Sequence, residues 1–323
     1  MSLENQTILL TGGSGTFGHA FVRYALNGKE IPRSIRILSR HEDLQEQMRR
    51  TFNDDQRLRF FIGDVRDKDR LLRAMTGVDI VIHAAALKQV PACEYNPLEA
   101  CKSNIDGTAN VINAAIDTGV PNVIEISTDK AVHASNLYGA TKLVAEKLMI
   151  QGNSYSQRTH FSCVRYGNVI GSRGSIVPLF QEQKKSGVIT VTDERMTRFW
   201  ITQQEGVKFV VDCLDIMHGG EIFVPKIRCS GIMDMVKTIA PECAIKIIGV
   251  RPGEKLCEVL ITEEESRHTR EFDSFYIIDP ELPYWGYKPI EGGNPLPYGF
   301  QYVSDNLKQF ITVEELKRKV EEI

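Results

Sequence analysis

Short apolar runs rich in branched side chains alternate with amphipathic stretches through the first half of the chain. The runs predict strands at residues 6–11, 34–39, 58–63, 79–85, 122–127 and 161–167, and the clearest helical spacing lies at 17–27 and 104–119. Strands that alternate with helices make right-handed crossovers and place helices on both faces of a parallel sheet. The pattern therefore predicts an α/β fold built on a doubly wound parallel sheet.

Two capping boxes mark helix starts in the second half of the chain, where the alternation becomes irregular. Thr202 and Thr312 are each followed three residues later by a glutamate, Glu205 and Glu315, whose carboxylate can reach back to the threonine N–H. Each pair predicts a helix that begins there. Turns rich in Pro and Gly separate the remaining segments, at 251–255, 279–289 and 291–299.

The change of pattern near residue 168 predicts two domains, which the length of 323 residues also allows. Residues 1–168, with a returning segment at about 199–224, would form the larger domain around the doubly wound sheet. Residues 169–198 and 225–323 would form a smaller, mostly C-terminal α/β domain that binds the substrate.

Composition places the chain among soluble globular proteins, since 42% of its residues are hydrophobic and 25% are charged. The net charge of −3 argues against binding nucleic acid. No apolar stretch is long enough to span a membrane and the N-terminus lacks a signal-peptide pattern, so we expect a cytoplasmic protein without membrane contact. The seven cysteines are scattered without a CxxC pair, which favours reduced, packed thiols and no metal site.

A glycine-rich loop, TGGSGTFG, directly follows the first predicted strand. Gly12, Gly15 and Gly18 have the spacing of short-chain dehydrogenases, and Gly13 offers the alternative G-x-G-x-x-G register with the last two. Glycines allow a sharp turn and let backbone N–H groups at a helix N-terminus approach a pyrophosphate. The loop therefore predicts a Rossmann-type dinucleotide site. Its predicted contacts are Gly12, Gly15, Thr16, Phe17 and Gly18.

The end of the second predicted strand favours NADP over NAD. Ser39 and Arg40 stand where an NAD site usually has an acid for the ribose hydroxyl, and a guanidinium there can bind the 2′-phosphate of NADP. Glu42 and Asp43 follow closely and could still serve a ribose, which keeps NAD open. Further predicted cofactor contacts follow the third and fourth strands, at Asp64, Val65, Ala84, Ala85 and Ala86.

The fifth predicted strand leads into IEISTDKAVHASNLYGATKL, which carries the candidate catalytic groups. Tyr138 and Lys142 are four residues apart and share one face of a helix. An ammonium beside a phenol stabilises the phenolate, so Tyr138 can exchange a proton with a sugar hydroxyl while hydride moves to a nicotinamide. With Thr128 at the end of the strand, these residues predict the catalytic triad of a short-chain dehydrogenase, in which Tyr138 and Lys142 also contact the cofactor.

A series of long motifs connects the chain to one family. They are TGGSGTFG, IGDVRDKDRL, HAAALKQVP, EYNPLEA, STDKAV, NLYGATKL, VRYGNVIGSRGSIVP, ERMTRFW, MHGGEIFVPKI and IIGVRPGEKL. Together they resemble the inverting UDP-N-acetylglucosamine 4,6-dehydratases of pseudaminic acid biosynthesis, which are extended short-chain dehydrogenases, over about residues 5–265. One stretch departs from the family: His133, Ala134 and Ser135 stand where NPI or NPV is usual, which affects the pocket more than the reaction.

The resemblance implies a dehydration that consumes no cofactor. NADP would oxidise carbon 4 of the sugar, which acidifies the proton on carbon 5, and hydride would return to carbon 6 after water is lost. Lys130 is implied as the base at carbon 5 and Asp129 as the proton donor to the carbon 6 hydroxyl. Tyr138 stands where relatives that retain configuration tend to have methionine. The implied product is therefore the UDP-linked 4-keto-6-deoxy sugar of the L-arabino series, inverted at carbon 5.

The resemblance also implies which residues hold the UDP-sugar. Arg198 and Arg251 are candidates for the diphosphate, because a guanidinium binds phosphate oxygens through a rigid fork. Glu254 would bind the ribose hydroxyls of uridine. The remaining implied contacts with the diphosphate and sugar are Lys88, Asn168, Ser175 and the backbone around Val177. The family further suggests a homo-oligomer.

Two other functions share part of this pattern. An NADP-dependent nucleotide-sugar 4-epimerase would need the glycine loop, Tyr138 and Lys142, but not Asp129 together with Lys130, because it breaks no carbon–oxygen bond. A non-catalytic Rossmann protein that senses dinucleotides would need no intact Thr, Tyr and Lys set. His83 ends a buried strand, where we expect a packed, hydrogen-bonded core residue and not a catalyst.

Overall fold

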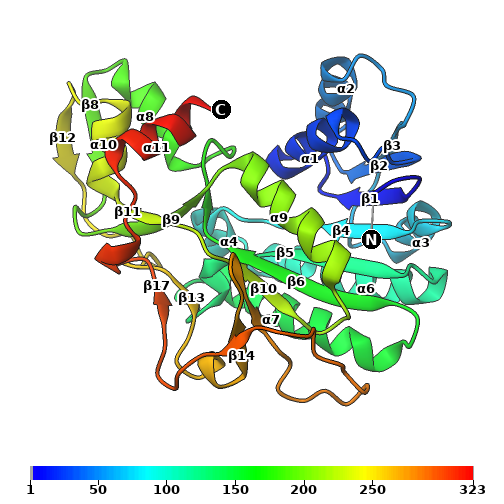
Figure 1. Cartoon of the computed structure of the whole chain (residues 1–323). Coiled ribbons are helices and arrows are strands. Elements are labelled where there is room, and N and C mark those ends of the chain that lie inside the picture. Colours follow the sequence, from blue (N-terminus) through cyan, green and yellow to red (C-terminus); the bar gives the residue numbers. More distant parts are fainter. Residues whose placement is uncertain (1–2, 323) are drawn as a thin grey trace.

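The computed structural model describes residues 3–322, and one large sheet lies at its centre (Figure 1). The strand order is β16-β14-β15-β10-β6-β5-β4-β1-β2-β3, and the seven strands from β10 to β3 are parallel. From β1 the chain builds the sheet first in one direction, through β2 and β3, and then in the other, through β4, β5 and β6, as in a doubly wound sheet. The strands are Thr7–Thr11 (β1), Ser34–Ser39 (β2), Leu58–Ile62 (β3), Ile80–His83 (β4), Asn122–Thr128 (β5), His160–Tyr166 (β6), Ile222–Pro225 (β10), Thr269–Glu271 (β14), Phe275–Ile278 (β15) and Asn294–Pro295 (β16).

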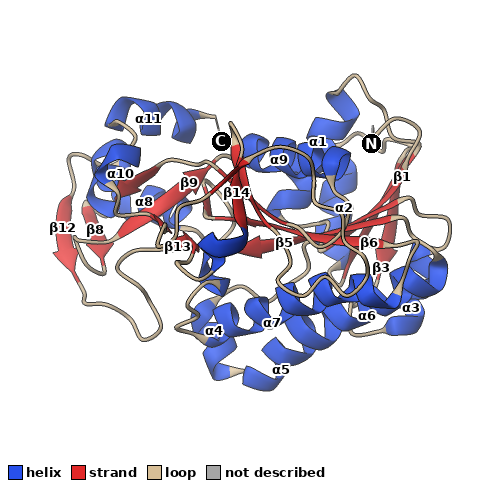
Figure 2. Cartoon of the chain, turned by 60° about the horizontal axis from the view of Figure 1, so that its bottom comes forward, coloured by secondary structure: helices blue, strands red, loops and turns tan. Residues whose placement is uncertain are grey.

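Helices cover both faces of this sheet (Figure 2). One face carries Thr16–Asn27 (α1), Glu42–Thr51 (α2) and Gln203–Ile216 (α9), whose apolar side chains share one buried cluster. The other face carries Lys68–Met75 (α3), Val90–Tyr95 (α4), Pro97–Cys101 (α5), Gly107–Thr118 (α6) and Leu137–Gly152 (α7), and α3, α6 and α7 pack on a second cluster. The predicted doubly wound α/β fold is confirmed.

The predicted elements form close to where the sequence placed them. Each of the six predicted strands is present, with ends that differ from the prediction by at most two residues. Both capping boxes are present too: the hydroxyls of Thr202 and Thr312 accept from the backbone N–H of Glu205 and Glu315, and each glutamate carboxylate accepts from the threonine N–H. They begin α9 and Val313–Glu321 (α11), which confirms both predicted helix starts.

A smaller lobe lies beside the large sheet, at the left of Figure 1. It has its own apolar core, in which Phe180, Trp200, Met235 and Leu316 are buried. The elements beyond the large sheet are Asn168–Val169 (β7), Ile176–Lys184 (α8), Val188–Val191 (β8), Thr197–Ile201 (β9), Cys229–Gly231 (β11), Ile232–Ile239 (α10), Ala244–Ile247 (β12), Val259–Ile261 (β13), Tyr302–Val303 (β17) and α11.

Part of the predicted second domain extends the large sheet. Strands β15, β14 and β16 fall within residues 225–323, and β15 pairs antiparallel with β10, with Ile222 opposite Ile278. The chain thus crosses between the lobe and the sheet more often than the sequence pattern indicated. The domain boundaries at 1–168, 199–224, 169–198 and 225–323 stay a prediction.

Several minor expectations can be checked in the described residues. His83 is buried, with its ring nitrogens hydrogen-bonded to Thr11 (2.7 Å) and Thr108 (3.1 Å), so the predicted core role is confirmed. Burial lowers the pKa of this imidazole to about 3. The seven cysteines are free thiols and four of them are buried. Within residues 3–322, no helix combines the length and the hydropathy needed to cross a bilayer.

Candidate active site

The glycine-rich loop joins β1 to α1 and leaves the first turn of α1 available to an anion. Gly12 has a φ of +66°, a backbone conformation that favours glycine, and a Cβ at Gly18 would lie 1.8 Å from the Gly13 carbonyl oxygen. In the described chain, no side chain caps α1 at Gly15. The helix N-terminus, with its unsatisfied N–H groups and positive dipole end, therefore fits the pyrophosphate of a dinucleotide.

A cavity of about 900 Å³ connects this loop with the carboxyl ends of the parallel strands and with the smaller lobe. It brings together nearly all the residues predicted for the cofactor, the chemistry and the substrate. Three predicted residues do not line it: Gly18, Asp129 and Val177. Gly18 packs α1 against the loop, Asp129 is fully buried behind Lys130, and the Val177 side chain lies in the core of the smaller lobe. Any ligand contact at Val177 is therefore made by the backbone, as predicted.

The predicted triad lies where β5 passes through a short turn, Asp129–Ala131 (η2), into α7. The Thr128 hydroxyl lies beside the phenol of Tyr138, and Tyr138 is one helix turn before Lys142. Burial raises the pKa of the Tyr138 phenol, and the Lys142 ammonium opposes that rise. Burial alone would lower the pKa of Lys142, but a direct contact with the Glu125 carboxylate raises it. Lys142 thus stays a cation beside the phenol, which is the arrangement that favours a phenolate.

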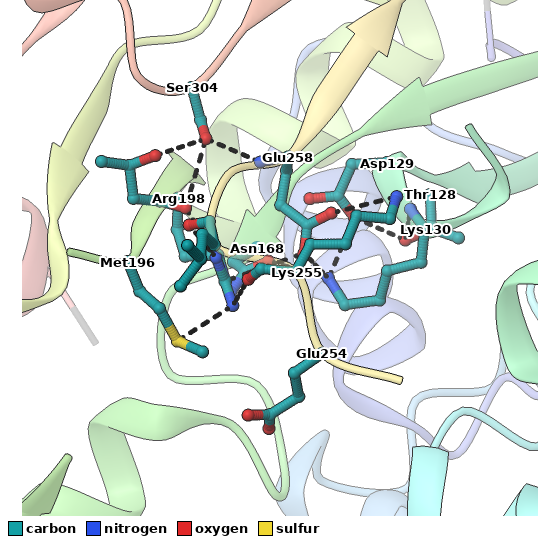
Figure 3. A network of polar contacts seen from close by, with 12 residues as sticks. Thr128, Asp129, Lys130, Asn168, Met196, Arg198, Glu254, Lys255, Glu258 and Ser304 are labelled. Atoms are coloured by element: carbon teal, nitrogen blue, oxygen red, sulfur yellow. Dashed lines mark hydrogen bonds and ion pairs between the residues drawn. The ribbon is translucent and has the colours of Figure 1, made fainter. Parts of the chain in front are cut away.

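Lys130 reaches into the cavity beside the triad and contacts three oxygens (Figure 3). Its Nζ lies 3.1 Å from Asp129 Oδ1, 3.3 Å from Asn168 Oδ1 and 3.4 Å from Glu258 Oε1. Burial would lower the pKa of Lys130, but the Asp129 and Glu258 carboxylates outweigh burial and raise it. Burial raises the pKa of Asp129, and Glu258 adds to the rise. In this geometry Lys130 carries a proton that Asp129 is well placed to accept.

The two predicted diphosphate ligands differ in how free they are. Arg251 is on the turn after β12, its side chain is 51% exposed, and it contacts Glu254 at 3.9 Å. Arg198, on β9, is 11% exposed and donates to the backbone oxygens of Thr197 (2.7 Å), Leu256 (3.1 Å) and Lys255 (3.0 Å). The donors of Arg198 therefore fix the segment that carries Arg251 and Glu254, and Arg251 is the freer guanidinium for a ligand.

The stretch that departs from the family holds the loop at 251–255 against the turn at Asp129–Ala131. Ser135 Oγ and Asn136 Nδ2 both donate to the Gly253 carbonyl oxygen, at 2.9 and 2.8 Å. Gly253 has a φ of +80°, and a Cβ there would lie 2.8 Å from the Asn136 Cβ, so the close approach needs glycine. His133 itself has a φ of +46°. Residues 133–136 thus link the loop at 251–255 to the turn that carries Asp129 and Lys130.

Ser39, Arg40 and Asp64, the residues predicted to lie near the adenosine of a dinucleotide, line one part of the cavity. The Arg40 side chain is 44% exposed and its guanidinium lies 3.9 Å from the Asp64 carboxylate. Gln45 Nε2 donates to the Ser39 hydroxyl at 2.9 Å, which orients that side chain. The Arg66 guanidinium donates twice to the Asp64 carboxylate. Burial would raise the pKa of this carboxyl, but the contacts with Arg66 outweigh burial and lower it. Arg40 is free to turn toward a phosphate.

Three charged residues of the site were missed at the sequence level: Glu125, Lys255 and Glu258. Glu258 and Glu125 are fully buried within apolar segments, LCEVL and VIEIS, and a charge inside such a run is the one signal that pointed to them. Lys255 belongs to the RPGEK motif but had no assigned role; its Nζ donates to the Val132 carbonyl oxygen at 2.6 Å. Their positions depend on contacts far along the chain, which spacing does not reveal.

Comparison with known proteins places this geometry in a family. A family model described as polysaccharide biosynthesis protein matches residues 8–280. The chain belongs to this family. Among its curated relatives is the UDP-N-acetylglucosamine 4,6-dehydratase (inverting) of Campylobacter jejuni subsp. jejuni (strain 81-176), 46% identical over 324 residues that cover 97% of this chain and 96% of the relative. The UDP-glucose 4-epimerase of Rickettsia conorii is 41% identical over 325 residues, 97% of this chain and 94% of the relative.

A solved family structure has the same fold over the full length. The X-ray structure of Pen from Bacillus thuringiensis superposes with a TM-score of 0.92 at 37% identity, covering 100% of this chain and 99% of that one. The resemblance to the inverting dehydratases, members of the extended short-chain dehydrogenases, is confirmed. The prediction of an enzyme is also confirmed, because relatives that match nearly the whole chain are named as dehydratases, which are hydro-lyases.

Proposed function

We propose that this protein is a UDP-N-acetylglucosamine 4,6-dehydratase that inverts carbon 5 of the sugar and uses NADP. The observation that carries the proposal is the contact between Asp129 and Lys130, 3.1 Å apart beside Thr128 and Tyr138 in one cavity. An acid and a base next to a dehydrogenase triad are the groups that a combined oxidation and elimination requires. A relative of this name at 46% identity supports it.

NADP fits the glycine loop and the Arg40 end of the cavity. The uncapped N-terminus of α1 suits the pyrophosphate, and Arg40 is near enough to the adenosine end to pair with a 2′-phosphate. When bound, the nicotinamide supplies a hydride acceptor for carbon 4 and a hydride donor for carbon 6. Asp64, Val65 and Ala84 to Ala86 complete the proposed contacts.

Tyr138 takes the proton of the carbon 4 hydroxyl in the redox step. The Lys142 ammonium lowers the cost of the phenolate, and the Thr128 hydroxyl orients the phenol oxygen. Thr128 also donates to Asp129 Oδ1 at 2.9 Å, so its hydroxyl lies between the redox tyrosine and the acid of the next step.

Lys130 and Asp129 acquire their roles by exchanging a proton. Transfer from Lys130 Nζ to Asp129 Oδ1 converts an ammonium and a carboxylate into an amine and a carboxylic acid without changing the net charge. The raised pKa of Asp129, caused by burial, favours this transfer, whereas the raised pKa of Lys130, caused by the Asp129 and Glu258 carboxylates, opposes it. The amine then takes the carbon 5 proton, and the acid protonates the carbon 6 hydroxyl as it leaves as water. The elimination returns the pair to its starting charge state. After hydride has returned to carbon 6, the resulting enolate takes a proton from solvent at carbon 5, on the face opposite Lys130, and Tyr138 releases to solvent the proton that it took from the carbon 4 hydroxyl.

The UDP moiety is proposed to lie between the lobe and the large sheet. Arg251 binds the diphosphate, with Arg198 adding positive charge from behind the loop, and Glu254 binds the uridine ribose. Ser175 begins α8 with a buried hydroxyl that has no hydrogen-bond partner in residues 3–322, which suits a phosphate or sugar oxygen. Asn168 and Lys88 also line the cavity and are proposed to contact the sugar.

A product analysis tests the proposal. Purified protein is incubated with UDP-N-acetylglucosamine and NADP+, and the mixture is followed by NMR. A new methyl doublet with the L-arabino configuration at early times is the expected result. In deuterated water the doublet collapses because carbon 5 takes up deuterium. A D-xylo product at early times would overturn the inversion, and no methyl signal would overturn the dehydratase.

A 4-epimerase is the second candidate, because a relative named UDP-glucose 4-epimerase is 41% identical over 97% of the chain. It would invert carbon 4 and release no water, so the same NMR experiment would show an epimeric UDP-sugar without a methyl signal. A role in pseudaminic acid biosynthesis, cytoplasmic location and assembly into a homo-oligomer remain part of this proposal. Exposed apolar side chains on α4, α5 and α7, among them Tyr95 and Leu98, favour self-association.

A further inference from the structure

Glu258 is a buried carboxylate on the cavity wall that no step above uses. It is 2% exposed and lies just before β13, where three cations from three segments converge on it (Figure 3). Its Oε1 lies 3.4 Å from Lys130 Nζ and 3.7 Å from Arg198 Nε, and its Oε2 lies 3.6 Å from Lys255 Nζ. One anion therefore links the catalytic turn, β9 and the substrate loop.

The backbone of Glu258 is held by two hydrogen bonds to Ser304. Its N–H donates to Ser304 Oγ at 2.8 Å and its carbonyl oxygen accepts from the Ser304 N–H at 2.9 Å. Ser304 is fully buried and also hydrogen-bonds Thr197, next to Arg198 on β9. The carboxylate therefore has a defined place relative to the cavity.

The contacts of Lys130 form a tripod of acceptors. An ammonium has three N–H bonds, and the oxygens of Asp129, Asn168 and Glu258 lie within 3.1 to 3.4 Å of Nζ from three elements. Once the proton has moved to Asp129, the neutral amine keeps two N–H bonds. The oxygens of Asn168 and Glu258 remain as their acceptors and fix the place of the nitrogen, while its lone pair faces the protonated Asp129 until the amine turns toward carbon 5.

We propose that Glu258 is a positioning residue for the dehydration: its carboxylate orients the Lys130 amine and sets how strongly Lys130 holds its proton. The proposal rests on the proposed function and extends it to a residue that directly precedes β13. It also explains why a carboxylate is buried here although its Oε2 has no hydrogen-bond partner among residues 3–322. The benefit of burying this carboxylate is that it places the base correctly.

The charges around Lys130 determine the direction of the pH effect. Asp129 and Glu258 are the anions that face it, Arg198, Lys88 and Lys255 are the cations nearby, and the Tyr138 side chain lies beside them. Burial would raise the pKa of Glu258, but Lys130, Arg198 and Lys255 lower it, so it stays ionised. If the Glu258 carboxylate were removed, only Asp129 would offset burial and the nearby cations. The pKa of Lys130 would then fall.

The test compares Glu258→Gln, which keeps the shape and removes the charge, with the control Glu264→Gln. Glu264 is an exposed carboxylate six residues further along and lies outside the cavity wall. Lys130 is labelled with acetic anhydride in the protein without ligands, between about pH 7 and 10, and its modification is followed by mass spectrometry. In Glu258→Gln we expect the labelling curve of Lys130 to move about one pH unit or more lower. In Glu264→Gln it should match the wild type.

Kinetics provide the second readout. For Glu258→Gln we expect kcat for exchange at carbon 5 to fall about 10- to 100-fold, because a misplaced base reacts slowly, while KM changes little. The rising limb of the pH profile should move to lower pH together with the labelling curve. Glu258→Asp keeps the charge at a greater distance and should give an intermediate shift.

The outcomes separate the two proposals. A wild-type protein that releases no water from the sugar contradicts the proposed function, whatever Glu258 does. A wild type that does so, with Glu258→Gln labelling and exchanging like the wild type at every pH, overturns the role of Glu258. If Glu258→Gln does not fold, Glu258→Asp decides: an unchanged labelling curve and an unchanged kcat overturn the proposal, and a downward shift supports it.

Discussion

Replacing Glu125 by glutamine should destabilise the protein in a way that depends strongly on pH. Glu125 lies in the middle of β5, is 0% exposed, and contacts Lys142 Nζ, whose side chain is 4% exposed. Glutamine keeps the shape of the side chain and removes the charge that balances the ammonium. A buried ammonium without a counterion is unfavourable, so we expect the pKa of Lys142 to fall in the variant.

The size of the effect follows from the burial of the pair. Removing one partner of a buried ion pair costs about 3–5 kcal/mol. The loss of unfolding free energy has an upper limit, because the variant can fold with Lys142 as a neutral amine. Removing that proton costs about 1.4 kcal/mol for each pH unit below the ordinary pKa of 10.5, so the limit at pH 7 is about 5 kcal/mol. At pH 9 the same limit is about 2 kcal/mol.

The sign follows from the direction of the two shifts. In the wild type the folded-state pKa of Lys142 is raised, so its contribution is fully present below the ordinary value and is lost only as pH rises through the folded value. In the variant the folded-state pKa is lowered. The penalty is then present at neutral pH and disappears as pH rises toward the ordinary value.

Urea unfolding at about pH 7 and pH 9 measures this difference, with Lys142→Met and the double variant as controls. The double variant leaves no buried charge alone, so it should recover much of the stability that Glu125→Gln loses at neutral pH. Carbon 4 oxidation in Glu125→Gln should need a higher pH, because Tyr138 loses its cationic neighbour. A loss of stability that is equal at both pH values would refute the reasoning.

The remaining predictions concern the cofactor, the base and a helix cap. Arg40→Ala should weaken binding of NADP+ by about tenfold or more and leave NAD+ nearly unchanged in a binding titration; equal losses would contradict the 2′-phosphate contact. Lys130→Ala should slow deuterium uptake at carbon 5 by about 100- to 10,000-fold while oxidation at carbon 4, seen as absorbance of the reduced cofactor, persists. Normal uptake would remove Lys130 as the base. Thr312→Ala should lower the unfolding free energy by about 1 kcal/mol through loss of the hydrogen bond from Glu315, and Thr312→Ser should restore it.

The catalytic stretch could be predicted because its geometry is local. Thr128 ends a strand, Asp129 and Lys130 form the turn, and Tyr138 and Lys142 follow on one helix face, so a run of fifteen residues places all five groups. The glycine loop is local in the same sense. A strand, a tight turn and a helix start determine it, and the sequence shows all three.

The charges that surround these groups are not local, and the sequence did not reveal them. Glu258 meets Lys130 only because Ser304 and β9 hold its segment against the catalytic turn, and Ser135 reaches Gly253 across 118 residues. Arg198 also shows what the sequence could not reveal. As an arginine it was predicted to bind phosphate, but in the structure most of its N–H groups donate to nearby backbone oxygens. Residue type shows which chemistry a side chain can do, but long-range packing decides what it faces.

The sequence by itself determined the doubly wound sheet, the dinucleotide loop and the five catalytic candidates, because periodicity, turn glycines and helix spacing act over a few residues. Only the tertiary structure decided that strands from the C-terminal region extend the large sheet, that Glu125 balances Lys142, and that Glu258 gathers Lys130, Arg198 and Lys255. The physical reason is burial. A carboxylate inside an apolar run is costly unless distant cations meet it, and which cations do so depends on how the whole chain packs.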